Sequence, residues 1–117
     1  MNLKELFSKV LFFSALLSVM VLALLPVELL TLPAFNWWDK AQHALAFVVL
    51  SLLGFAAFPE RVRRVALGMV LYGVAIELAQ LALGWRLGEW QDVMADSAGI
   101  LAAWSARSLW LKWRVAT

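Results

Sequence analysis

The hydrophobic positions of this chain gather into four long runs, separated by short stretches that carry charges or proline. The runs cover about 10–32, 41–58, 65–83 and 93–111, each close to the roughly 20 residues that a helix needs to cross a bilayer. None of them alternates with period two, as the strands of a membrane barrel do. Because a backbone inside a bilayer must satisfy its own hydrogen bonds, the pattern predicts four transmembrane helices.

The composition agrees with a membrane protein. The chain has 117 residues, of which 64% are hydrophobic and 15% are charged. Soluble domains are about half apolar and about a quarter charged, and a short soluble chain has a large surface that polar residues must cover. We therefore expect an all-α integral membrane protein, with residues 1–117 forming a single compact bundle.

The first run has the alternative of a cleaved signal peptide, because Lys4 and Lys9 precede its apolar part. The segment that follows, PVELLTLP, contains no small-residue cleavage site of the Ala-x-Ala type. Cleavage would also leave an odd number of spans. A retained helix is therefore the prediction.

Basic residues predict the orientation, since Lys and Arg collect on the cytoplasmic side of membrane proteins. The side that holds both termini and the second connection has eight of them: Lys4, Lys9, Arg61, Arg63, Arg64, Arg107, Lys112 and Arg114. The other side has two, Lys40 and Arg86. Both termini are therefore predicted to be cytoplasmic. Nucleic-acid binding, which a pI near 9.4 would otherwise suggest, is not expected, because these charges flank apolar runs as membrane anchors do.

Polar side chains within the runs are concentrated near the outer boundary. Asp39 and His43 open the second run, Glu77 and Gln80 close the third, and Asp92 and Asp96 open the fourth. At about 1.5 Å per residue, all of them lie within about 10 Å of that boundary. The pattern predicts a polar cavity that opens outward between the second, third and fourth helices.

Two stripes indicate which faces pack. Gly73, Glu77, Gln80 and Gly84 share one face of the third helix, and Ala95, Gly99 and Ala103 form a small-residue ladder beside Asp96 on the fourth. Small residues let helices approach closely in lipid. We therefore expect Glu77 and Asp96 to face protein.

These residues supply the candidate chemistry. Ionisable groups inside a membrane are candidates for function, so Glu77, His43 and Asp96 are predicted as catalytic groups. The predicted ligand-binding residues are Asp39, Lys40, Gln80, Arg86 and Asp92. Most of them also have a structural alternative. His43 would be an imidazole at the membrane interface, partnered by Asp39 or by lipid headgroups. Glu77 and Gln80 would form an interhelical clamp to Arg86 or the fourth helix, Asp39 and Asp92 would be helix caps, and Arg86 would form a salt bridge.

The sequence does not decide whether the protein binds a metal or a cofactor. The chain has no cysteine and one histidine, so a metal site would need carboxylates as its remaining ligands. Such a donor set suits Mg, Mn or Zn, but no ligand spacing typical of a metal site is present.

The combined motifs resemble the VanZ-like family of small bacterial membrane proteins, named for an accessory protein of teicoplanin resistance. The resemblance rests on Asp39-Lys40-x-x-His43, Glu77-x-x-Gln80, Arg86, Asp92 and Gly99, and covers about residues 39–99. Phe47 stands where the family pattern has Tyr, Gly84 where it has Pro, and Asp96 where it has Asn. The resemblance implies a four-helix protein of the bacterial inner membrane with a role in the cell envelope or antibiotic resistance, but no particular reaction.

Three functions follow as hypotheses. The first is binding of a lipid-linked cell-wall precursor or a glycopeptide in the outward cavity. The second is an intramembrane enzyme that modifies such a lipid, with Glu77 or Asp96 as acid or base, His43 as base or ligand, and Arg86 as anion clamp. The third is a small proton-coupled transporter, for which four spans would require an oligomer.

Overall fold

The computed structural model describes residues 2–24, 36–84 and 90–116, with side chains from residue 41 in the second segment and for residues 91–115 in the third. The described residues form four helices and no strand, which confirms the predicted all-helical class for this part of the chain. The helices are α1 (Leu3–Leu24), α2 (Asn36–Ala57), α3 (Val62–Leu83) and α4 (Trp90–Ala116).

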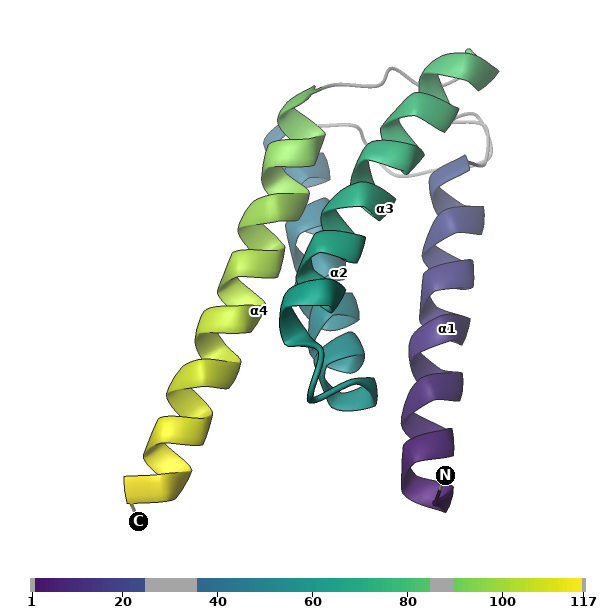
Figure 1. The fold of residues 1–117 in the computed structure, drawn as a ribbon. Coiled ribbons are helices and arrows are strands. Elements are labelled where there is room, and N and C mark those ends of the chain that lie inside the picture. Colours follow the sequence, from purple (N-terminus) through teal and green to yellow (C-terminus); the bar gives the residue numbers. More distant parts are fainter. Residues whose placement is uncertain (1, 25–35, 85–89, 117) are drawn as a thin grey trace.

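The four helices run alternately up and down (Figure 1). We call the end where α1 and α3 finish and α2 and α4 begin the upper end, and the end that holds both chain termini the lower end. Helix α2 contacts each of the other three and packs most extensively against α4, whereas the described residues of α1 make no contact with those of α4. Helix α2 therefore holds the bundle together, with α1 and α4 on opposite sides of it (Figure 1).

The core lies mainly between α2, α3 and α4, and its largest fully buried side chains are Phe47, Leu50 and Phe55 of α2. Helix α1 adds one buried side chain, Phe12. Gly99 of α4 explains the close fit of α2 and α4, because a Cβ built on it would lie 2.3 Å from the carbonyl oxygen of Ala44. Only glycine permits this approach.

Helix bounds differ from the predicted runs at their polar ends. Helix α1 begins at Leu3 because Asn2 caps it: the Asn2 Oδ1 accepts the backbone N–H of Glu5 at 2.8 Å. The predicted continuation of this helix, residues 25–32, lies outside the described residues. Helices α2 and α4 extend beyond their apolar runs, to Asn36 and Ala116, since polar residues at helix ends need not interrupt a helix.

The α2–α3 turn and the end of α3 are fixed by backbone hydrogen bonds. The N–H of Arg61 donates to the Phe58 carbonyl at 3.0 Å, just before α3 begins. At the other end Gly84 takes φ 78°, and its N–H donates to the Gln80 carbonyl. This left-handed C-cap favours glycine and ends α3 at the upper end.

Two of the described helices, α1 and α3, are long and apolar enough to cross a membrane, with mean hydropathies of 2.2 and 1.8. In α2 the apolar segment is the shorter Ala41–Ala57. Helix α4 carries Asp92 and Asp96 near its start and Arg107 in its second half. Many large apolar side chains are exposed on all four helices, among them Phe7, Leu45, Leu78 and Leu101. This distribution favours a membrane protein, since water-soluble proteins rarely expose large contiguous apolar patches.

Candidate functional site

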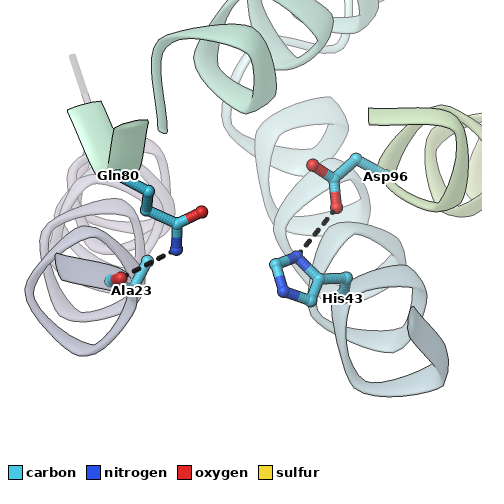
Figure 2. Close-up of polar contacts among 4 residues, drawn as sticks. All are labelled: Ala23, His43, Gln80 and Asp96. Carbon is cyan, nitrogen blue, oxygen red and sulfur yellow. Dashed lines mark hydrogen bonds and ion pairs between the residues drawn. The ribbon is translucent and has the colours of Figure 1, made fainter. Parts of the chain in front are cut away.

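At the upper end a polar contact joins His43 of α2 to Asp96 of α4. Their Nδ1 and Oδ1 atoms lie 3.3 Å apart (Figure 2). Asp96 is buried, whereas the side chain of His43 is 18% exposed to solvent. The structure thus brings together two of the three predicted catalytic residues.

Two glycines make room for this pair. Gly99, one turn further along α4, lets that helix meet the α2 backbone beside His43. Across from Asp96, a Cβ built on Gly73 of α3 would lie 2.9 Å from Oδ2. Asp96 is therefore enclosed by α2 on one side and α3 on the other.

Burial confirms most of the two predicted packing faces, although Ala95 of the small-residue ladder is only half-buried. On α3, Gly73, Glu77 and Gln80 are buried, while Gly84 at the C-cap is exposed. On α4, the buried residues Asp92, Asp96, Gly99 and Ala103 follow one another at helical spacing. Three carboxyl side chains, those of Glu77, Asp92 and Asp96, are thus turned into protein near the upper end.

Gln80 is placed differently from its neighbours. Its Nε2 donates to the backbone carbonyl of Ala23 in α1 at 2.8 Å, on the other side of the view from the His43–Asp96 pair (Figure 2). Two turns below, the Tyr72 hydroxyl donates to the carbonyl of Leu16, also in α1. This geometry matches the clamp alternative for Gln80, although the clamp holds α1 and not α4.

The pair's arrangement suits proton chemistry. A carboxylate beside Nδ1 orients an imidazole and favours a proton on that nitrogen, which leaves Nε2 to exchange protons with a ligand. A buried ionised carboxylate is costly in a membrane, by about 3 kcal/mol at mid-bilayer, so a cationic partner offsets part of that cost. The pair could therefore serve either binding or catalysis.

The metal hypothesis gains no support from the described side chains. Among them, no group of three or more His, Asp and Glu residues lies close enough to hold a metal ion. The described part of the chain thus offers the His43–Asp96 pair alone and no larger ligand set.

Three predicted ligand-binding residues cannot be placed. Asp39 and Lys40 belong to the first turns of α2, but their side chains lie outside the described residues, and so does Arg86. The outward cavity would be bounded partly by these residues and stays a prediction.

Two polar residues, one half-buried and one fully buried, were missed by the sequence reasoning. Tyr72, which reaches α1, is the chain's one tyrosine and lies within an apolar run. Ser51 is fully buried, and its hydroxyl has no hydrogen-bond partner among the described residues. Its position two turns after His43 and one after Phe47 puts it on the same face of α2, and this spacing could have identified it.

The departures from the VanZ-like pattern have local explanations. Phe47 packs against Tyr72, with ring centroids 6.0 Å apart, and its ring edge also approaches Gly73. At Gly84, a φ of 78° excludes proline, whose ring fixes φ near −65°. At position 96 a carboxylate in place of an amide allows an ion pair with His43.

Comparison with known proteins agrees with the motifs and extends the similarity beyond residues 39–99. No curated protein and no solved structure matches the chain. The VanZ/LLP1 family matches residues 3–111, which includes α1 and most of α4 as well as the motif region. The fold, the paired motifs and this match over nearly the whole length lead to one conclusion: the chain belongs to the VanZ/LLP1 family.

Proposed function

We propose that this protein crosses the bacterial inner membrane four times, with both termini in the cytoplasm, and binds the polar head of an amphiphile at its upper end. The orientation is supported by the basic residues: eight lie on the side of the termini, and two, Lys40 and Arg86, are predicted on the other side. The alternating helix directions are compatible with it (Figure 1).

The observation that carries the binding proposal is the His43–Asp96 contact within a set of buried acids. Asp96, Asp92 and Glu77 are at most 6% exposed; Glu77 belongs to α3, and the two aspartates belong to α4. Keeping three carboxyl groups in an apolar bundle costs stability, and such groups are usually retained for a function. Arg86, which the sequence predicts on the same side of the membrane, would add a guanidinium for a phosphate or carboxylate.

The ligand class is an amphiphile with a polar or anionic head, such as a lipid-linked cell-wall intermediate or a glycopeptide. Teicoplanin, whose resistance gives the VanZ-like family its name, is one probe, and a polyprenyl diphosphate sugar is another. Binding to the purified protein in nanodiscs should fall at least tenfold in His43→Ala and Arg86→Gln. Leu78→Ala, on the exposed face of α3, is the matched control. Unchanged binding in both site variants would refute the proposal.

The orientation has its own test. The chain has no cysteine, so single cysteines placed at Asn2, Gln91 and Lys112 can be labelled one at a time. Asn2 and Lys112 should react from the cytoplasmic side only, and Gln91 from the outer side only. Any other pattern contradicts the proposed topology.

A second candidate function is an enzyme acting on the same lipid, which the orientation of His43 favours. With Nδ1 directed at Asp96, Nε2 would serve as the acid or base, and Glu77 would be a second proton-transfer group. Glu77→Gln should then abolish turnover of the lipid while leaving affinity and thermal stability unchanged. Equal losses of affinity and stability would indicate a structural role for Glu77.

A further inference from the structure

A second feature lies at the lower end, away from the His43–Asp96 pair. An apolar groove of about 330 Å³ runs between α1 and α3. Its walls are Phe12 and Leu16 of α1 and Val65, Met69 and Tyr72 of α3. The Tyr72 hydroxyl, bonded to the Leu16 carbonyl, bridges the two helices at the groove's upper limit.

Gly68 lies in this groove and leaves it open. A Cβ built on Gly68 would meet no atom within 4 Å, so the space beside it is not filled by the chain. From Arg61 to Tyr72 the groove follows α3 for about 16 Å at 1.5 Å per residue. This length matches about half of a hydrocarbon core of roughly 30 Å, which is the depth of one leaflet.

The mouth of the groove is cationic. Arg61 and Arg64 line it, and they also line a neighbouring pocket of about 690 Å³ with Arg63 and Arg107. One acid, Glu60, lines that second pocket. Lys9 stands over the ring of Phe58, another groove residue, at 5.2 Å. Positive charge therefore exceeds negative charge where the apolar groove meets the polar boundary.

An apolar groove that is one leaflet deep and has arginines at its mouth fits one class of molecule. Guanidinium groups bind phosphate oxygens through paired hydrogen bonds, and the groove suits an acyl chain. Basic pockets on the cytoplasmic side of helical bundles bind anionic headgroups, and the cytoplasmic leaflet is rich in anionic lipid. We propose that the groove between α1 and α3 is a binding site for one anionic phospholipid, its phosphate held by Arg61 and Arg64 and an acyl chain lying beside Gly68.

This site is distinct from the proposed amphiphile site and rests on the membrane placement alone. The purified protein in nanodiscs of phosphatidylglycerol and phosphatidylcholine is the system for testing it, with retained lipid measured by native mass spectrometry. We expect one phosphatidylglycerol to be retained in preference to phosphatidylcholine. Replacing both arginines, Arg61→Gln with Arg64→Gln, should lower this preference on the order of tenfold.

Gly68→Leu tests the groove itself. Leucine has a higher helix propensity than glycine, so the variant should fold, while its side chain fills the space for the acyl chain. Ala102→Leu on an exposed face of α4 and Lys112→Gln beyond both pockets are the matched controls, and both should retain lipid as the wild type does. Gly68→Leu should retain none.

Three outcomes would overturn the proposal. Retention unchanged in Gly68→Leu would exclude the groove as the site. Displacement of the lipid by glycerol 3-phosphate at equal concentration would indicate a site for a soluble anion only. A dimer that Gly68→Leu dissociates would mean that a second copy of the chain fills the groove. None of these variants alters His43, Asp96 or Arg86, so failure here is separable from failure of the proposed function.

Discussion

Gly99 of α4 lies directly against the carbonyl oxygen of Ala44 in α2, so close that a Cβ on Gly99 would come within 2.3 Å of it. The neighbour is a backbone atom of a packed helix, which cannot rotate away as a side chain would. This contact sets the separation of α2 and α4 one turn from the His43–Asp96 pair. The geometry of the pair therefore depends on a residue that has no side chain.

The first prediction is that Gly99→Ala destabilises the protein. The added methyl must force α2 and α4 apart, which we expect to cost about 1–3 kcal/mol, as overpacking does elsewhere. Thermal unfolding in detergent measures the loss.

Gly68→Ala is the matched control for this variant. Its Cβ would enter open space, so the substitution should be neutral or should stabilise α3 by up to about 1 kcal/mol. Equal melting temperatures for the two variants would show that Gly99 does not limit the helix separation.

The second prediction concerns the proton on His43. A carboxylate oxygen 3.3 Å from Nδ1 favours a proton on that nitrogen, so we expect the neutral imidazole to carry its proton on Nδ1. His43 is the chain's one histidine, so ¹⁵N-labelled histidine gives an unambiguous spectrum. Asp96→Ala should shift the neutral ring toward the Nε2-protonated form that is usual in water.

Asp96→Asn refines this test. Asparagine, the residue of the VanZ-like pattern, keeps an oxygen acceptor and should preserve the Nδ1 proton while removing the charge. A wild-type spectrum in Asp96→Ala would mean that Asp96 does not orient the ring.

The third prediction is that Tyr72 and Gln80 fasten α1 to α3. Each donates a hydrogen bond from its side chain to an α1 carbonyl, and such bonds between membrane helices contribute about 1 kcal/mol. Tyr72→Phe and Gln80→Leu should each speed hydrogen exchange of α1 amides without affecting α4, which the described residues of α1 do not contact.

Ser18→Ala supplies the comparison for these two variants. The Ser18 hydroxyl donates to Ser14 within α1, so its loss removes a hydrogen bond without detaching the helix. If Ser18→Ala accelerates α1 exchange as much as Gln80→Leu does, the bonds between helices are not what holds α1.

The fourth prediction is that Asn2→Ala frays the start of α1. The Asn2 Oδ1 accepts the Glu5 N–H, and loss of such a cap costs about 1 kcal/mol of helix stability. Exchange of the amides in the first turn of α1 should accelerate. Asn2→Asp retains the accepting oxygen and should behave as the wild type; if it frays equally, capping is not the cause.

Hydrophobic periodicity predicted the helical class and the buried faces, because both follow from the position of each residue along its own helix. Glu77 and Asp96 face protein, as their stripes indicated. Partners across helices were not predictable in this way. Gln80 reaches Ala23 of α1, although the sequence suggested Arg86 or the fourth helix, because such partners depend on how each helix is rotated and which helix lies beside it.

The two proposed sites, one at each end of the bundle, also differ in how readily the sequence predicts them. Charged residues within apolar runs drew attention to His43 and Asp96. Arginines at a turn that is predicted to be cytoplasmic are common anchors, so Arg61 and Arg64 suggested nothing further until the structure placed them at the mouth of a groove.

The attachment of α1 has a consequence for how its sequence can vary. Both bonds from α3 end on main-chain carbonyls, at Leu16 and Ala23, and every amino acid supplies that oxygen. The contact between the two helices therefore does not depend on which side chains α1 carries at these positions, but it does require the two donor side chains of α3. In a saturation mutagenesis of the whole chain, Tyr72 and Gln80 should tolerate few replacements, whereas Leu16 and Ala23 should accept most apolar residues of similar size.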